Sequence, residues 1–100
     1  VVRVIARSTL KKFWERKGCA DSEQSILSWF AEAKSAEWKN PNHVKDQYSN
    51  ASILKRGRVV FNIAGNKYRL VVKINYDKAI VYIRFIGTHK EYDEIDPETI

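Results

Sequence analysis

The chain has 100 residues, 44% of them hydrophobic, and a formal net charge of +6 at pH 7. That length suits one modest hydrophobic core, so we expect a single domain over residues 1–100. No stretch reaches the roughly 20 apolar residues of a membrane span, and no segment has the layout of a signal peptide. Cys19 is the only cysteine, which excludes an internal disulfide and fits a reducing cytoplasm. One Cys and two His also argue against a structural zinc site.

The positive charge is unevenly distributed along the chain. Residues 91–100 hold five acidic side chains and no Lys or Arg, so residues 1–90 carry 18 basic against 7 acidic groups. A basic body of this size suits a polyanionic partner, above all nucleic acid. Many small cytoplasmic proteins are equally basic without such a partner, so charge alone leaves both readings open.

The first 18 residues predict a strand and a helix. The segment VVRVIA (1–6) favours a short strand. Ser8 is placed to cap the helix that follows, and Gly18 is a natural stop for it. Apolar residues at helical spacing define its buried face, namely Leu10, Phe13 and Trp14.

A second helix is predicted from Asp21 to a point before Pro41. Asp21 is expected to cap it, with Gln24 three residues later as a capping-box partner. The segment 41–53 is expected to be a loop with about one turn of helix near residues 44–48. The predicted buried stripe of the helix consists of Ile26, Leu27, Phe30 and Ala33, with Trp29 alongside.

From residue 52 onward the hydrophobic period changes from 3.6 to 2. Strands are predicted at 58–64, 67–76 and 79–86, joined by turns at Gly65-Asn66 and Asp77-Lys78. The fold class is therefore α+β, a small antiparallel sheet with two N-terminal helices packed on one face.

The two turns also predict the register of the strands, and so the residues on each face. The expected cross-strand pairs are Ile63 with Tyr68, Asn62 with Arg69, Val72 with Ile83 and Val71 with Arg84. The face expected to contact the helices carries Val59, Phe61, Ile63, Leu70, Val72, Ile74, Val81, Ile83 and Phe85. The other face is expected to carry Arg58, Asn62, Lys67, Arg69, Lys73, Tyr82 and Arg84. A basic surface with an aromatic ring suits an RNA strand, although many antiparallel sheets have a solvated polar face that binds nothing.

The segment IGTHKEYDEID (86–96) follows the third strand and gathers groups that handle protons. His89 can titrate near neutral pH, Arg69 can bind a phosphate through two parallel hydrogen bonds, and Tyr92 can donate a proton or stack on a base. Metal-free RNA cleavage needs a base, an acid and cations of this kind. The alternatives are a merely exposed histidine and a Tyr92 that packs the C-terminal segment. Glu91 and Asp93 are then solvated charges or a partner for Arg84.

Taken together, the segment VVFNIAGNKYRLVVKINYDKAIVYIRFIGTHKEYD (59–93) and the two preceding helices resemble the HigB-type toxins of bacterial toxin–antitoxin pairs, within the RelE-like group. The resemblance covers essentially the whole chain, and the run GTHKEYD after a strand is its most specific part. It implies the RelE-like toxin fold and a cytoplasmic bacterial endoribonuclease that cuts mRNA in the ribosomal decoding site without a metal or other cofactor. It also implies a cognate antitoxin, a helix-turn-helix repressor of HigA type, and no membrane partner.

By the same resemblance, Arg69 corresponds to a phosphate-contacting arginine, and His89 and Tyr92 lie where relatives place catalytic residues. We therefore expect Arg69, His89 and Tyr92 to be catalytic. Expected RNA-binding residues are Arg58, Asn62, Lys67, Lys73, Tyr82, Arg84 and Lys90. His89, or alternatively Tyr92, is expected to be the general base. The alternative function from another class is a non-catalytic RNA- or ribosome-binding module, which needs the basic face but not His89.

Overall fold

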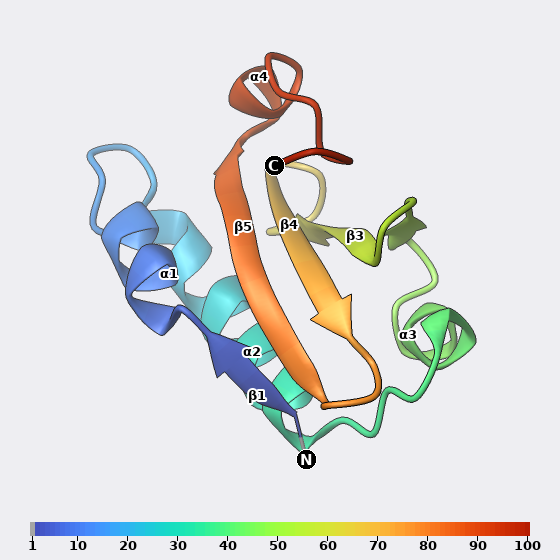
Figure 1. Cartoon of the computed structure of the whole chain (residues 1–100). Coiled ribbons are helices and arrows are strands. Elements are labelled where there is room, and N and C mark those ends of the chain that lie inside the picture. Colours follow the sequence, from blue (N-terminus) through green and yellow to red (C-terminus); the bar gives the residue numbers. More distant parts are fainter. Residues whose placement is uncertain (1) are drawn as a thin grey trace.

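The computed structural model describes residues 2–100, and it contains one five-stranded sheet flanked by helices (Figure 1). The first half of the chain forms β1 (Arg3–Ile5), α1 (Arg7–Trp14), the 3-10 helix η1 (Ala20–Ser22), α2 (Glu23–Ser35) and α3 (Pro41–Gln47). The second half forms β2 (Ser52–Ile53), β3 (Arg58–Ile63), β4 (Tyr68–Asn75), β5 (Ile80–Thr88) and α4 (His89–Tyr92). No helix within residues 2–100 has the length and apolar character that crossing a membrane requires.

The sheet order is β1-β5-β4-β3-β2, with β1 parallel to β5 and the other neighbours antiparallel. The predicted meander is confirmed, and the opening strand lies at one edge of the sheet. The part of that prediction that falls on Val1 lies outside the described residues. Both turns lie where they were predicted. Each has four unpaired residues instead of two, because the last strand pairs before the turns are Ile63 with Tyr68 and Asn75 with Ile80.

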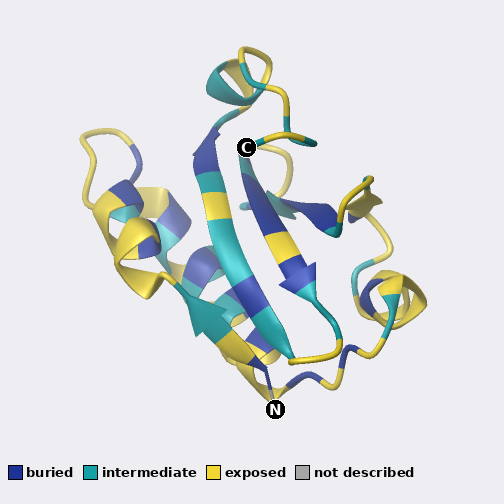
Figure 2. Cartoon of the chain, viewed as in Figure 1, coloured by how far each residue is buried: buried dark blue, intermediate teal, exposed yellow. Residues whose placement is uncertain are grey.

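Helices α1 and α2 cover one face of the sheet, as predicted (Figure 1). Leu10 and Phe13 of α1 and Ile26, Trp29 and Ala33 of α2 are at most 3% exposed, because the 3.6-residue period places them on the sheet side of each helix. The strand residues of this core are Val59, Phe61, Ile63, Tyr68, Leu70, Val72, Ile74, Val81 and Ile86. Figure 2 shows the resulting pattern, with buried residues on the strands and on the inner sides of these helices.

The predicted helix caps are wrong. Ala6 is the N-cap residue of α1, so Ser8 lies inside that helix. Ser22 is the N-cap residue of α2 and its side chain does not cap the helix, since its hydroxyl donates to the carbonyl oxygen of Cys19 at 2.6 Å. The carboxylate of Asp21 does not cap it either, because it accepts hydrogen bonds from β4 and its preceding turn.

The segment 41–53 is more regular than predicted. Helix α3 has two turns, and it begins with Asn40, whose side-chain oxygen accepts from the backbone N–H of His43, and with a proline in the first turn. Strand β2 then pairs with β3 through two residues. Val44 of α3 is fully buried, so this helix closes the side of the core next to β3.

The sheet face turned away from α1 and α2 is here called the outer face. Its composition differs from the prediction at β5, where Val71 pairs with Phe85 rather than with Arg84. A β-bulge between the Val72–Ile83 and Val71–Phe85 pairs makes Arg84 an extra residue, which reverses the facing of every later β5 side chain. Phe85 therefore lies on the outer face, and Ile86 takes its predicted place in the core.

Residues 93–100, here called the C-terminal segment, turn back from α4 toward the sheet, and Figure 1 shows the C-terminus near the α4 end of β4. The carbonyl oxygen of Ile100 accepts hydrogen bonds from Arg58 of β3 and Arg84 of β5. Val60 and Val71, a cross-strand pair on the outer face, are 3% and 0% exposed. The outer face is thus partly covered.

Candidate functional site

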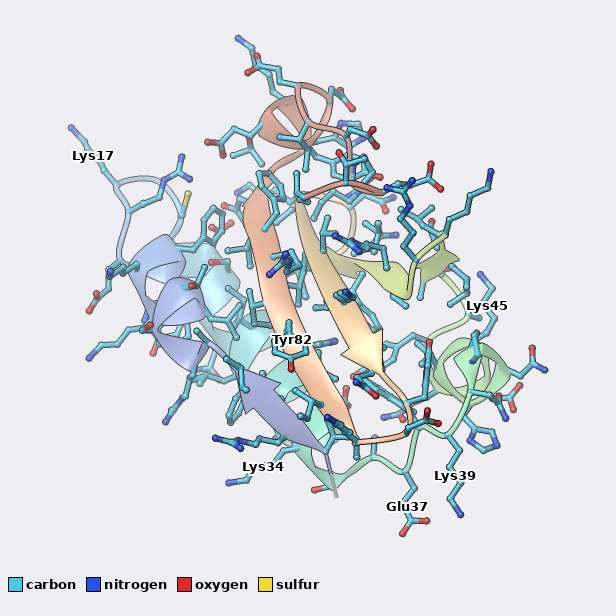
Figure 3. All side chains as sticks on the ribbon, in the orientation of Figure 1. Lys17, Lys34, Glu37, Lys39, Lys45 and Tyr82 are labelled. Atoms are coloured by element: carbon cyan, nitrogen blue, oxygen red, sulfur yellow. The ribbon has the colours of Figure 1, made fainter. Side chains whose placement is uncertain are left out.

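The outer face consists of three cross-strand rows over β3, β4 and β5. They are Asn62–Arg69–Gly87, Val60–Val71–Phe85 and Arg58–Lys73–Tyr82. Polar and basic side chains therefore lie in the two end rows, and an apolar strip separates them. The predicted pairing of Asn62 with Arg69 is confirmed. Figure 3 shows Tyr82 projecting from β5 away from the helices, as predicted.

Arg69 is half-buried beside the turn that precedes β4. Its Nη1 donates to the carbonyl oxygens of Asn66 and Tyr68, at 2.9 and 3.2 Å. Within residues 2–100, no carboxylate lies within ion-pair distance of this guanidinium. Its charge is thus held in place by neutral acceptors, an arrangement that suits an incoming anion such as a phosphate.

Helix α4 begins at a capping box. The hydroxyl oxygen of Thr88 accepts from the backbone N–H of Glu91 at 3.2 Å, and the Glu91 carboxylate accepts from the Thr88 N–H at 2.9 Å. Arg16, which follows α1, also donates to Glu91 at 3.2 Å. These bonds, the one from the Thr88 backbone most of all, hold the pKa of Glu91 below its usual range. Glu91 is therefore not a partner of Arg84, and it positions the helix that carries His89 and Tyr92.

His89 is exposed at the start of α4, and its Nδ1 lies 3.3 Å from a carboxylate oxygen of Asp93. If Nδ1–H donates to Asp93, the other ring nitrogen, Nε2, carries the lone pair and can accept a proton. Tyr92 is half-buried on the same helix, and Lys90 is exposed beside it. All three predicted residues thus stand on one short helix at one end of the outer face.

The sheet brings Arg69 and this helix together. Arg69 pairs with Gly87, two residues before His89. Paired Cα atoms in antiparallel strands are about 4.5–5.5 Å apart, and two further residues add at most about 7 Å. Side chains as long as arginine and histidine can contact one phosphodiester from that separation, so the strand pairing is compatible with a joint role of Arg69 and His89.

Gly87 is a site residue that the sequence reasoning missed. A Cβ atom here would lie 2.6 Å from Cζ of Phe85 and 3.1 Å from Oε1 of Glu91. The absence of a side chain therefore lets the Phe85 ring and the capping carboxylate approach β5 next to Arg69. The signal available in the sequence was a glycine inside a strand pattern, directly before a Thr-x-x-Glu capping motif.

The far end of the outer face holds the other predicted cations. Lys73 and Arg84 are exposed, whereas Arg58 is only 7% exposed. Nε and Nη2 of Arg58 donate to the Ile100 carbonyl oxygen at 3.2 and 2.5 Å, and Nε of Arg84 donates to the same oxygen at 3.3 Å. The two arginines therefore converge on one oxygen atom.

The prediction that Lys67 belongs to the outer face is wrong. Lys67 lies in the turn before β4, and its ammonium pairs with Asp21 on the helix side of the sheet. The Tyr68 hydroxyl donates to the same carboxylate at 2.6 Å. Hydrogen bonds from Lys67 and Tyr68 lower the pKa of Asp21, so this cluster joins the turn to the start of η1.

Within residues 2–100, no group of three or more His, Cys, Asp or Glu side chains is arranged to hold a metal ion. The roles of the predicted site residues stay predictions. What the structure establishes is their placement: Arg69, His89, Lys90 and Tyr92 lie at one end of the outer face, and Arg58, Lys73, Tyr82 and Arg84 lie at the other.

Comparison with known proteins agrees with the resemblance noted in the sequence. A family model described as HigB_toxin, RelE-like toxic component of a toxin-antitoxin system, matches residues 22–95. Curated relatives include the mRNA interferase toxin HigB of Escherichia coli (strain K12) and the mRNA interferase HigB of Shigella flexneri. Each is 47% identical over 34 residues, which is 34% of this chain and 33% of the relative. The matched stretch thus spans about a third of the length of these relatives. The family match covers most of the chain, and the chain belongs to the HigB family of RelE-like toxin components of toxin–antitoxin systems.

Proposed function

We propose that this chain is an mRNA-cleaving toxin whose reaction site is the end of the outer face formed by Arg69 and α4. The observation that supports the proposal is the pairing of Arg69 with Gly87, two residues before the helix of His89 and Tyr92, together with the lack of a carboxylate partner for Arg69 within residues 2–100. Relatives named mRNA interferases support the substrate class.

The proposed reaction uses the ribose of the substrate as the nucleophile. Nε2 of His89 removes the 2′-hydroxyl proton, and the 2′-oxygen forms a bond to the adjacent phosphorus. The bond from phosphorus to the 5′-oxygen breaks, and Tyr92 donates a proton to that leaving oxygen. The products are a 2′,3′-cyclic phosphate and a free 5′-hydroxyl. Arg69 stabilises the charge on the phosphorane oxygens, and Arg84 and Lys90 support RNA binding.

The partners are proposed on the same basis. The mRNA substrate is cut in the ribosomal decoding site of a bacterial cytoplasm, where ribosomal RNA helps to orient it. A HigA-type helix-turn-helix antitoxin holds the toxin inactive. The excess of basic groups in residues 1–90 supports a polyanionic partner for this chain.

The test is translation of a defined mRNA by purified ribosomes, followed by mapping of the ends that cleavage produces. Wild-type protein should cut the message and leave 2′,3′-cyclic phosphate termini. Arg69→Ala and His89→Ala should each lower the cleavage rate by about 10²-fold or more, as expected for loss of a charge-stabilising donor or a general base. Tyr92→Phe should lower the rate as well, because it removes the proposed acid, and retained cleavage in His89→Ala beside loss in Tyr92→Phe would assign the base to Tyr92.

Lys78→Ala is the matched control, since Lys78 is exposed in the turn at the other end of β4 and β5. It should cleave like wild type. Full activity in both Arg69→Ala and His89→Ala would show that the reaction site is elsewhere. Ribosome binding and growth inhibition without any cut message would instead support the non-catalytic module.

A further inference from the structure

Arg58 is a buried charge that no acidic side chain of residues 2–100 contacts. Its side chain is 7% exposed, and within residues 2–100 no Asp or Glu lies within ion-pair distance of it. Burial of an arginine is costly unless its donors are satisfied, and here the acceptors are backbone carbonyl oxygens of Arg56 and Ile100. Arg58 is therefore held within the outer face by main-chain oxygens, with no acidic side chain beside it in residues 2–100.

Arg84 brings a second guanidinium to the same point. It is the extra residue of the β5 bulge, and its Nε reaches the Ile100 oxygen that Arg58 also contacts. Three N–H donors from two arginines thus converge on one oxygen at 2.5 to 3.3 Å. Two guanidinium groups around one oxygen are an arrangement that recognises an oxygen of a phosphate or carboxylate.

The Ile100 oxygen that lies between Arg58 and Arg84 belongs to an acidic segment of the chain. Residues 91–100 hold five carboxylates, and the end of this segment meets the sheet at Lys55, Arg58 and Arg84 through Glu98 and Ile100. The C-terminal segment is held by few bonds. Besides the contacts of Ile100, the Glu98 carboxylate accepts from the backbone N–H of Lys55, and Asp96 accepts from the N–H groups of Glu98 and Thr99.

We propose that Arg58 and Arg84 form a second phosphate-binding subsite for RNA, which the C-terminal segment occupies in the free protein. This inference rests on the proposed function, because it assigns a substrate contact beyond the reaction site at Arg69 and His89. RNA crossing the outer face from α4 places one phosphate at the reaction site and a later one at Arg58 and Arg84. The Ile100 carbonyl holds the position of an oxygen of that later phosphate.

Binding of RNA then requires the C-terminal segment to leave. An acidic segment on a basic surface competes with a polyanion. The apparent affinity for RNA is then the intrinsic affinity multiplied by the fraction of molecules in which the segment is released. Loosening the segment should strengthen RNA binding, and removing an arginine of the subsite should weaken it. The two perturbations have opposite signs, which a general loss of folding cannot produce.

The experiment measures binding of a 2′-O-methyl oligoribonucleotide, which cannot be cleaved, by fluorescence anisotropy over a range of salt concentrations. Arg84→Ala should reduce the slope of log affinity against log salt concentration by about 0.7, which corresponds to about five-fold in affinity over a tenfold range of salt. Lys78→Ala changes an exposed residue of a turn and should bind RNA as tightly as wild type. Asp96→Ala removes the acceptor for the Glu98 N–H and should bind more tightly than Glu94→Ala. Both of these variants lose one negative charge, and Glu94 makes no side-chain hydrogen bond in residues 2–100.

Hydrogen exchange in residues 93–100 provides the second readout. Exchange should increase when the oligonucleotide saturates the protein, because the bonds of Ile100 and Glu98 are replaced. Equal affinities of Arg84→Ala and Lys78→Ala, together with unchanged exchange in this segment, would overturn the subsite. Because the probe cannot be cleaved, these results stand apart from the proposed reaction, which is tested by the cleavage of mRNA on ribosomes by the wild-type protein and its Arg69→Ala and His89→Ala variants.

Discussion

Replacing Glu91 tests whether the motif THKE acts mainly through its helix cap. Glu91→Ala removes the acceptor of the Thr88 N–H at 2.9 Å and the partner of Arg16 at 3.2 Å. A net hydrogen bond contributes about 0.5–1.5 kcal/mol, and the ion pair adds at most a few tenths because its side chains are 47% and 40% exposed. The free energy of unfolding should therefore fall by about 0.5–2 kcal/mol. Glu91→Gln keeps an acceptor for Thr88, so it should lose about 0.5 kcal/mol or less.

The assay is urea unfolding of the variants, with Glu94→Ala as the control that removes a nearby charge without a side-chain hydrogen bond. The pKa of Glu91 is lowered in the folded protein, so its ionised form stabilises the fold above the ordinary value of 4.5. The difference between wild type and Glu91→Ala should therefore shrink as the pH falls through the folded pKa. Cleavage by Glu91→Ala should fall as well, because α4 carries His89. Equal stability of Glu91→Ala and Glu94→Ala would refute the capping argument.

Three further predictions follow from contacts around the sheet. Gly57→Ala should lower the free energy of unfolding by about 2 kcal/mol or more, since Gly57 has a φ of +74° and a Cβ would lie 2.9 Å from a backbone carbonyl of β4. Gly87→Ala should lower the free energy of unfolding by less, about 1 kcal/mol, because the atom nearest to the added Cβ is the tip of the Phe85 ring, which can move. Chemical denaturation of both variants measures the difference. Asp21→Asn should lower the free energy of unfolding near neutral pH but not in strong acid. The pKa of Asp21 is lowered in the folded protein, so its ionised carboxylate stabilises the fold above the ordinary value of 3.8, and this stabilisation disappears as the pH falls through the folded pKa. Thermal unfolding at several pH values tests this, and a difference that grows in acid would contradict it.

The strands and their register were predictable because the period of 2 is clear from residue 58 onward. Asn62 with Arg69 and Val72 with Ile83 pair as expected, and these pairs place Arg69 on the outer face. The bulge at Arg84 was not predictable from alternation. One extra residue leaves the hydrophobic pattern of β5 almost unchanged, because Phe85 and Ile86 are both apolar and either could face the core.

The placement of charged side chains was less predictable than that of apolar ones. Lys67 and Asp21 are far apart in sequence, and an ion pair between them has no periodic signal. The capping box from Thr88 to Glu91 was visible as a motif, but the same residues also suggested proton chemistry, and that interpretation took precedence. Both interpretations hold if Glu91 positions α4 and His89 acts from it.

The covered outer face shows why the charge asymmetry of this chain matters. Residues 1–90 are strongly basic and residues 91–100 are acidic, and the two parts meet at Arg58 and Arg84. The apolar pair of Val60 and Val71 lies between this contact and Arg69, so an open sheet would expose an apolar strip between two basic ends. In a bound RNA, bases stacked on Phe85 and Tyr82 would cover that strip while phosphates met the arginines. In the free protein the C-terminal segment contacts the same face through Ile100, so the proposed RNA strand and this segment would compete for Arg58 and Arg84.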